Sequence, residues 1–255
     1  MTVLRLENLT KAFGGLTAVA GFCLDLGARD IQGVIGPNGA GKTTTFNLLT
    51  GVYPADSGTM ALGDLDLTRL SPDAIARAGI ARTFQNIRLF AQMTVLDNIA
   101  QALHARAGYR LRDAVFRTGA FRRGEAALLA EALEHLERFG LAGVRDELAG
   151  SLPYGEQRRL EIARALATGP KVLLLDEPAA GMNPREVEQL IGLIRKVHDD
   201  FPLAILLIEH QLPVVMELCG FVQVLDFGQT IAAGAPRDVV RDPLVIEAYL
   251  GVEEA

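Results

Sequence analysis

The residues best suited to chemistry lie at positions 36–43, where the sequence reads Gly-Pro-Asn-Gly-Ala-Gly-Lys-Thr. This stretch matches the phosphate-binding pattern G-x-x-x-x-G-K-[ST], and it directly follows the apolar segment 31–35. Glycines let the backbone turn tightly so that successive N–H groups point at an anion, and a helix beginning at Lys42 adds its partial positive charge. The sequence therefore predicts a site for a nucleoside triphosphate.

Two side chains of this loop can bind the triphosphate and a metal ion. The Lys42 ammonium can reach the β- and γ-phosphates, and the Thr43 hydroxyl can ligate Mg²⁺. The residues of the loop that we expect to contact the nucleotide are Gly36, Asn38, Gly39, Ala40, Gly41, Lys42, Thr43 and Thr44.

A second candidate group is the adjacent pair Asp176 and Glu177, which follows the apolar run 172–175. Such a run favours a strand buried on both faces, and ligands of open parallel sheets bind at the carboxyl ends of the strands. Asp176 is then placed to hold Mg²⁺, usually through water, and Glu177 to polarise a water for in-line attack on the γ-phosphorus. An acidic pair alone is often a solvated turn, but the phosphate loop upstream favours the catalytic interpretation.

The strands that must position these residues are indicated by hydrophobic patterning, which alternates with helical patterns and favours an α/β core. Strands are expected at 3–6, 18–26, 31–35, 171–175, 203–208 and 221–225. The early segments alternate in polarity, whereas the segments at 172–175 and 203–208 are continuously apolar. The latter should therefore lie at the centre of a parallel sheet. A hairpin turn is expected at 226–229.

Helix starts are indicated by three capping patterns, at Thr94, at Ser71-Pro72 and at Asn183-Pro184. The pattern is helical from Thr94 to about residue 140, which indicates a second, helical lobe.

This middle section is locally positive although the whole chain carries a net charge of −6. Two acidic residues, Asp113 and Glu125, stand among six arginines between residues 106 and 125. The arginines are Arg106, Arg110, Arg112, Arg117, Arg122 and Arg123. A solvated surface loop and a contact with an acidic partner or lipid headgroups both explain this charge.

Length and composition limit the possible classes of protein. The 255 residues suit one sizeable α/β domain, or a core domain with a smaller lobe inserted in it. The longest apolar runs are far shorter than the ~20 residues that span a bilayer. The first residues lack the layout of a secretion signal, so we expect a cytoplasmic location. The negative net charge argues against a broad nucleic-acid-binding face. Cys23 and Cys219 are expected to be reduced core thiols, with no disulfide or metal site.

Further motifs in a fixed order show that the chain resembles the ABC ATPases over essentially its full length. Beside the phosphate loop, these motifs lie at 83–85, 152–157, 176–177, 180–183 and 209–210. The resemblance implies an α/β P-loop NTPase (RecA-like) fold with a mixed-sheet core, an N-terminal antiparallel β region and an inserted α-helical lobe. It implies one ABC ATPase domain, 1–255, divided into a nucleotide-binding core (1–88 and 160–236), a helical signature lobe (89–159) and a C-terminal helical tail (237–255).

The resemblance also implies ATP as the nucleotide and roles for three more residues. Gln85 looks like the lid glutamine that touches Mg²⁺ and the attacking water, His210 like the switch histidine that contacts the γ-phosphate, and Phe13 like the aromatic residue that stacks on adenine. The expected catalytic residues are therefore Glu177, His210 and Gln85, and the expected metal ligands are Thr43, Gln85 and Asp176.

Residues 152–156 correspond to the family signature, normally Leu-Ser-Gly-Gly-Gln, which closes over the ATP of a partner subunit. In this chain Pro153 replaces the serine, Tyr154 the first glycine and Glu156 the glutamine. Proline has neither a side-chain donor nor a backbone N–H, so the contact must depend on the Gly155 amide and on the start of the following helix. Gly155 and Glu156 complete the expected nucleotide contacts.

Within the family, the chain looks most like the larger ATPase subunit of the branched-chain amino-acid importers. The matching segments are 11–16, 82–90, 154–164, 178–184 and 248–251. This resemblance implies a peripheral subunit at the cytoplasmic face of the inner membrane that hydrolyses ATP to drive amino-acid uptake. Its implied partners are a second ABC ATPase subunit, identical or related, the transmembrane permease subunits and, indirectly, a solute-binding protein, with no nucleic acid.

Three alternatives stay open at this point. The first is an ABC ATPase that serves lipid or lipopolysaccharide export or urea uptake. The second is a soluble ABC module for DNA repair, ribosome work or iron–sulfur assembly. The third is a nucleotide-sensing subunit with little turnover, which the loss of the signature serine at Pro153 keeps open.

Overall fold

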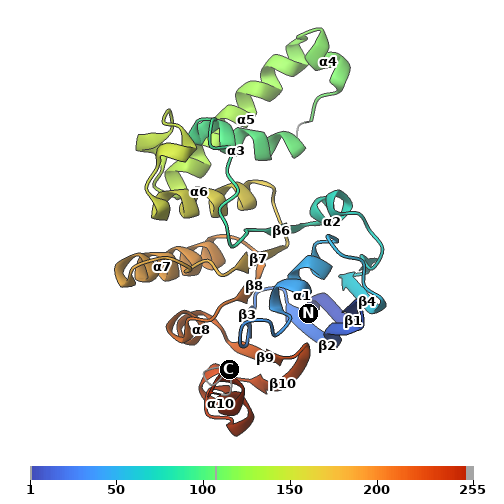
Figure 1. The fold of residues 1–255 in the computed structure, drawn as a ribbon. Coiled ribbons are helices and arrows are strands. Elements are labelled where there is room, and N and C mark those ends of the chain that lie inside the picture. The colour runs from blue at the N-terminus through green and yellow to red at the C-terminus, as the bar shows by residue number, and fades with distance from the viewer. Residues whose placement is uncertain (1, 107, 251–255) are drawn as a thin grey trace. The chain divides into compact units, whose positions relative to one another are not determined.

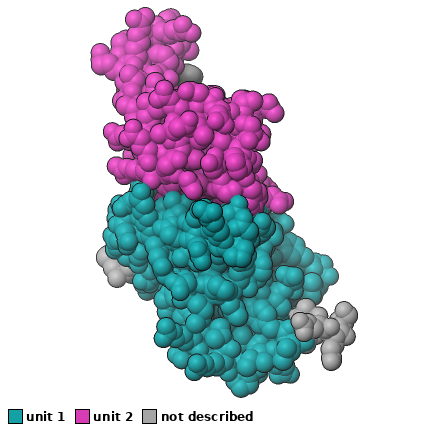
Figure 2. Space-filling view, turned by 90° about the vertical axis from the view of Figure 1, so that its left-hand side faces the viewer, with its two compact units in different colours: residues 1–85, 170–255 teal, residues 86–169 magenta. Residues whose placement is uncertain are grey.

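The computed structural model describes residues 2–106 and 108–250, and it divides into two compact units. Unit 1 consists of residues 1–85 and 170–255, and unit 2 of residues 86–169. Figure 2 colours the two units separately.

Unit 1 contains a four-stranded antiparallel sheet in the order β2-β1-β4-β5. Its strands are β1 (Thr2–Phe13), β2 (Leu16–Gly27), β4 (Ser57–Leu62) and β5 (Leu65–Asp66). In β2 the side chains of Phe22, Leu24 and Leu26 are buried and alternate with exposed neighbours, as the polarity pattern predicts for a sheet with one solvated face. Cys23 lies on the exposed face, so the prediction of a core thiol is wrong at this position, whereas Cys219 is buried.

The second sheet of unit 1 has six strands in the order β10-β9-β3-β8-β7-β6. Its strands are β3 (Ile31–Ile35), β6 (Ile80–Arg82), β7 (Val172–Asp176), β8 (Ala204–Ile208), β9 (Phe221–Asp226) and β10 (Gln229–Gly234). All are parallel to their neighbours except β10, which forms the expected hairpin with β9 through the pair Asp226 and Gln229. Every residue of β7 and β8 is buried, and both strands lie inside the sheet as predicted.

The helices of unit 1 connect and flank these strands (Figure 1). They are α1 (Lys42–Leu49), α2 (Pro72–Ala78), α7 (Pro184–Asp200), α8 (Leu212–Leu218), α9 (Pro236–Val239) and α10 (Pro243–Leu250). The predicted start of α7 is confirmed, because Asn183 Oδ1 accepts from the Glu186 N–H at 3.0 Å while Glu186 Oε2 accepts from the Asn183 N–H at 2.9 Å. The helix then buries the apolar stripe Val187, Leu190, Ile191, Ile194 and Val197.

Unit 2 is helical. Its elements are α3 (Val95–Leu103), α4 (Leu111–Val115), α5 (Gly119–Arg138) and α6 (Tyr154–Ala167), with 3-10 turns at His104–Arg106, Ala142–Val144 and Ala149–Ser151. The predicted cap is present, because Thr94 Oγ1 accepts from the Asp97 N–H at 3.0 Å. Helices α3, α5 and α6 pack against one another around buried residues that include Ile99, Leu136 and Ile162.

The compact units differ in their limits from the predicted subdivision. Unit 2 runs from residue 86 to residue 169, whereas the helical lobe was predicted at 89–159. Helix α6 accounts for the later end, because it continues unbroken through Ala167 and packs on α3 and α5. The predicted tail, 237–255, contains most of α9 and all of α10, and its residues 251–255 lie outside the described part of the chain.

Over the described residues, no helix is both long and apolar enough to cross a membrane.

Candidate functional site

The phosphate loop connects β3 to α1, and its glycines adopt backbone conformations that other residues rarely reach. Gly36, Gly39 and Gly41 have φ angles of 146°, 81° and 102°. A Cβ atom on Gly36 would lie 2.0 Å from the Leu225 carbonyl oxygen, and one on Gly41 would lie 2.3 Å from the Ala18 carbonyl oxygen. A Cβ atom on Gly39 would have no neighbour within 4 Å. Gly36 and Gly41 are therefore required by close packing, whereas Gly39 borders open space.

Lys42 begins α1, and its ammonium is buried within the loop. Its Nζ donates to the carbonyl oxygens of Gly36 at 2.7 Å and Pro37 at 2.8 Å. Burial lowers the pKa of Lys42, while the negative charges of Glu177 and Asp176 act to raise it. The structure thus brings the predicted phosphate-binding lysine into electrostatic reach of the predicted acidic pair.

The acidic pair lies where β7 ends, at the carboxyl edge of the parallel sheet. Asp176 is the last residue of the strand and is only 2% exposed. Glu177 has a φ of 46°, a left-handed conformation that is unusual for a residue other than glycine, and its N–H donates to the Ile208 carbonyl at 2.9 Å. Strained backbone of this kind is concentrated at functional sites, where the surrounding fold holds it in place.

Arg82 holds Asp176 and was not identified from the sequence. Its Nη2 lies 2.6 Å from Asp176 Oδ2, and both side chains are almost fully buried. The Nη1 atom donates to Asn47 Oδ1 at 2.8 Å and to Thr50 Oγ1 at 3.2 Å, so the guanidinium links β7 to α1. The guanidinium carbon lies 4.9 Å from the centre of the Phe84 ring. Nothing in a single sequence indicates this role, because it depends on which strands become neighbours.

Glu177, the second residue of the acidic pair, lies beside Gln85 and His210. Gln85 Nε2 donates to Glu177 Oε2 at 2.7 Å, and His210 Nδ1 lies 3.8 Å from the same oxygen. The three predicted catalytic side chains therefore meet in unit 1.

Glu209, which precedes His210, is fully buried and fixes the loop that follows β8. Its Oε1 accepts from the Ala179 N–H at 2.9 Å, and its Oε2 accepts from the N–H groups of His210 at 3.0 Å and Gln211 at 3.1 Å. It is a second residue that the sequence-based site did not contain. A buried carboxylate that accepts three backbone donors holds the His210 backbone in a defined place.

Phe13 ends β1, and its side chain is 42% exposed. Its ring meets that of Tyr53 edge-on with 5.1 Å between the centroids, and Lys11 Nζ lies 5.4 Å from the Phe13 centroid. An exposed aromatic face of this kind can stack on a base. Its contact with adenine stays a prediction.

The signature segment belongs to unit 2 and forms the start of α6. Pro153 precedes the helix, and its carbonyl accepts from the N–H groups of Glu156 and Gln157, each at 3.0 Å. Gly155 lies in the first turn. Within the helix, the buried side chains of Arg158 and Glu161 form an ion pair, with their Nη1 and Oε2 atoms 2.7 Å apart. The contacts of Gly155 and Glu156 with a nucleotide stay predictions.

The oxygen ligands that could hold a divalent cation are the hydroxyl of Thr43, the carboxylate of Asp176 and the amide of Gln85. Mg²⁺ prefers oxygen ligands and usually takes only one or two from the protein, with phosphate oxygens and waters completing the shell. Among the described residues there is no group of three or more His, Cys, Asp or Glu side chains that could hold a metal ion. That Thr43, Asp176 and Gln85 hold a cation together with a nucleotide stays a prediction.

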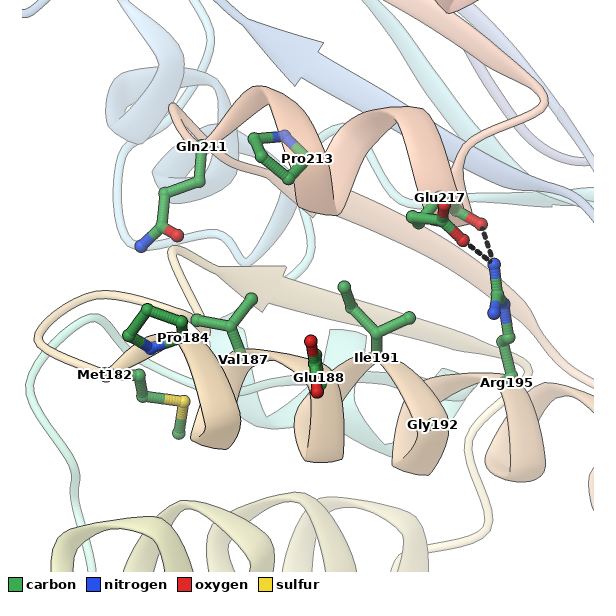
Figure 3. A pocket seen from close by; sticks show the side chains of 10 residues that line it. All are labelled: Met182, Pro184, Val187, Glu188, Ile191, Gly192, Arg195, Gln211, Pro213 and Glu217. Carbon is green, nitrogen blue, oxygen red and sulfur yellow. Dashed lines mark hydrogen bonds and ion pairs between the residues drawn. The ribbon is translucent and has the colours of Figure 1, made fainter.

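A separate groove lies between α7 and α8, with a volume of 590 Å³. Figure 3 shows that Val187 and Ile191 of α7 face Pro213 of α8 across it. At one end Arg195 forms an ion pair with Glu217. None of the residues predicted for the nucleotide site lines this groove.

Comparisons with known proteins agree with the fold. A family model described as ABC transporter matches residues 19–180, and one described as branched-chain amino acid ATP-binding cassette transporter matches residues 229–255. The chain is 45% identical over 249 residues to the high-affinity branched-chain amino acid transport ATP-binding protein LivG of Salmonella typhimurium, which covers 98% of both chains. It is 43% identical, with the same coverage, to the corresponding protein BraF of Pseudomonas aeruginosa.

A lipopolysaccharide export protein and a solved structure of an ATP-binding cassette are also similar to the chain. The chain is 36% identical over 251 residues to the lipopolysaccharide export system ATP-binding protein LptB of Escherichia coli, again covering 98% of both chains. A crystal structure of the ADP conformation of an ATP-binding cassette of an ABC transporter superposes with a TM-score of 0.85 at 33% identity, covering 98% of this chain and 99% of the other.

The fold and the phosphate loop define a nucleotide-binding ATPase of the ATP-binding cassette type, and the chain belongs to the ABC transporter family. Its C-terminal match and its similarity to LivG and BraF place it with the branched-chain amino acid group. The family resemblance, the fold class and the ATPase activity predicted from the sequence are thereby confirmed.

Proposed function

We propose that this chain is the ATP-hydrolysing subunit of an ABC importer that takes up branched-chain amino acids. The observation that carries this solute class is the pattern of similarity. The chain is 43–45% identical to two branched-chain amino acid transport proteins and 36% identical to a lipopolysaccharide export protein, at equal coverage. The match of residues 229–255 to the branched-chain family model supports the same conclusion.

The proposed chemistry assigns each residue of the site a task. The amides of the phosphate loop and the Lys42 ammonium hold the phosphates. Thr43, Asp176 and Gln85 would hold Mg²⁺, which would neutralise phosphate charge. Glu177 polarises the attacking water, and His210 contacts the γ-phosphate. The 2.7 Å hydrogen bond from Gln85 to Glu177 supports this arrangement, because it holds the carboxylate of the base in one orientation.

The proposed assembly places two ABC ATPase subunits, identical or related, so that the Gly155 segment of each covers the nucleotide of the other. Pro153 leaves the Gly155 amide and the start of α6 as the available donors for this contact. The pair would dock on transmembrane permease subunits at the cytoplasmic face of the inner membrane, with an extracytoplasmic solute-binding protein as an indirect partner.

A reconstituted complex tests the proposed solute class. The chain is extracted in mild detergent together with the membrane proteins that co-purify with it. The complex is then reconstituted in proteoliposomes so that this subunit faces the lumen, and ATP is enclosed in the lumen. We expect ATP hydrolysis to rise when a binding protein loaded with leucine, isoleucine or valine is added, and Lys42→Ala to abolish the rise. A complex that co-purifies with lipopolysaccharide-export components and ignores these amino acids would contradict the proposal.

A further inference from the structure

Residues 108–123 of unit 2 form a structural feature that nucleotide chemistry does not use, and we call it the arginine platform. It contains α4 and the first turn of α5, at the end of α5 that points away from α3 and α6 (Figure 1). Val115 and Phe116 are 67% and 78% exposed there, among the most exposed large apolar side chains described. Five exposed arginines lie around them: Arg110, Arg112, Arg117, Arg122 and Arg123.

The platform is folded onto α5 by specific contacts. The Tyr109 ring meets the Phe121 ring edge-on with 5.1 Å between the centroids, and the Tyr109 hydroxyl donates to Glu125. Asp113 Oδ1 accepts from the Thr118 hydroxyl at 3.1 Å, and Asp113 Oδ2 accepts from the Arg110 N–H at 3.2 Å. These contacts fix the backbone that displays the arginines and the two apolar side chains.

The same contacts leave the positive charge uncompensated. Asp113 is the acidic residue of the platform and Glu125 follows it by two positions, and both accept hydrogen bonds from neighbouring uncharged groups. Over the described parts of the chain, no ion pair involves any of the five platform arginines. By contrast, Arg106, just before the platform, pairs with Glu131 at 3.2 Å. The platform is therefore a concentrated positive patch on a chain whose net charge is −6.

The positive charge and the exposed apolar side chains together indicate which kind of partner the platform binds. Arginines attract phosphate groups of any source, but a nucleic acid offers no apolar phase for a valine and a phenylalanine that already point into solvent. A bilayer that contains anionic lipid offers phosphate headgroups and, just beneath them, an apolar boundary for the aromatic ring. We propose that the arginine platform binds the surface of an anionic membrane, with Phe116 entering the interface and the arginines contacting headgroups.

This inference does not depend on the proposed solute or on the permease, so it is tested with the full chain and lipid alone. Purified protein is sedimented with vesicles of pure phosphatidylcholine and with vesicles that contain about 30% phosphatidylglycerol, at low and at physiological salt. We expect binding only to the anionic vesicles, weakened by salt. Inorganic phosphate at matched ionic strength should not displace the protein, because a free anion offers no interface for Phe116.

Matched variants separate this site from a general effect of charge. Replacing Arg112, Arg122 and Arg123 by Gln should weaken vesicle binding roughly 100-fold, at about 1 kcal/mol per arginine near an anionic surface. The control replaces Arg185, Arg237 and Arg241 of unit 1, which are also exposed, and makes the same change in net charge. Phe116→Ser should weaken binding further, whereas Phe227→Ser, at a side chain 84% exposed in the β9–β10 turn, should not.

The outcomes decide between the possible explanations. If the two triple variants lost vesicle affinity equally, net charge alone would explain the binding, and the proposal would be overturned. The proposal is also overturned if the wild-type protein does not bind anionic vesicles while the platform variant no longer assembles with a purified membrane complex. In that case the partner of the patch is an acidic protein surface. Circular dichroism and ATP turnover in detergent solution, which should stay unchanged, verify that the variants are folded.

Discussion

The side-chain amide of Gln85 donates to the carboxylate of Glu177 over 2.7 Å. The two residues are far apart in sequence, but they follow β6 and β7, which pair in parallel from Ile80 with Val172 to Arg82 with Leu174. Parallel strands end at the same edge of a sheet, so this pairing brings the two segments together. The pairing of β6 with β7 therefore places the hydrogen-bond donor that orients the proposed base.

Glu177→Gln removes the negative charge of the proposed base but keeps a hydrogen-bond acceptor at the same place. The amide oxygen of the new side chain can still accept from Gln85, so the geometry is retained while the ability to take a proton is lost. We expect kcat for ATP hydrolysis to fall at least 100-fold, in the range typical of general-base removal, with the Kd for ATP within a few-fold of wild type.

Steady-state turnover and equilibrium nucleotide binding measure the two parts of this prediction. Glu188→Gln, an exposed residue of α7, is the matched control and should behave as wild type. A Glu177→Gln protein that turns over near the wild-type rate would remove Glu177 from the mechanism.

Arg82 and Asp176 form a buried ion pair, with side chains 5% and 3% exposed. Breaking such a pair by removing one partner leaves a buried charge uncompensated, which costs about 3–5 kcal/mol. We therefore expect Arg82→Met and Asp176→Asn each to lower the free energy of unfolding by several kcal/mol in nucleotide-free protein, and the double variant to lose much less than the sum.

Urea denaturation of the two single variants and the double variant gives the coupling energy directly. The matched control is Arg5→Met, because Arg5 pairs with Asp25 over 2.9 Å while both side chains are more than half exposed. Water and salt screen a pair between exposed side chains, so this variant should be nearly neutral. Additive losses at Arg82 and Asp176 would show that the pair does not act as a unit.

The glycines of the phosphate loop have separable functions. Gly36→Ala would place a Cβ atom 2.0 Å from the Leu225 carbonyl oxygen, so β3 and β9 must shift, and we expect a large loss of stability. Gly39→Ala meets no neighbour within 4 Å and bears only the cost of its positive φ, about 1–2 kcal/mol.

Thermal unfolding with and without ATP distinguishes the two variants. Gly36→Ala should be unstable in both conditions. Gly39→Ala should remain folded, with its principal defect in the rise of the melting temperature on adding ATP, because its methyl group enters the open space beside the loop. Equal destabilisation of the two variants without ATP would contradict this division.

Local sequence patterns predicted most of the helices and strands. The features that they missed depend on which strands pair with each other in the fold. The continuous apolar runs of β7 and β8 and the Asn183 cap are legible in the sequence, because each depends only on neighbouring residues. The three-residue strand β6 carries no such pattern, and without it the position of Arg82 beside Asp176 could not be inferred. Cys23 was misplaced because its apolar neighbours outweighed the alternation of β2, which puts it on the solvated face.

Cys219 makes the stability of the protein depend on alkaline pH. Burial, and to a lesser degree the charge of Glu209, raises the pKa of its thiol from 9.0 to about 12. Above pH 9 the unfolded chain therefore loses a proton that the folded chain keeps, so the thiol stabilises the fold fully below pH 9 and progressively less up to pH 12. In this window the free energy of unfolding should fall by about 1.4 kcal/mol per pH unit from this group alone.

Denaturant unfolding between about pH 8 and pH 10 measures this slope against two variants. Cys219→Ala lowers the stability at every pH, but it should remove the part of the slope that belongs to the thiol, so the gap to wild type narrows as pH rises. Cys23→Ala, which removes the exposed thiol, is measured beside it so that the loss of a cysteine as such is separated from the loss of the buried one. If the gap between wild type and Cys219→Ala stayed constant over this range, the buried thiol would be ionising as easily in the folded protein as in the unfolded chain, and the packing around α8 and β9 would have to be more open than the structure shows.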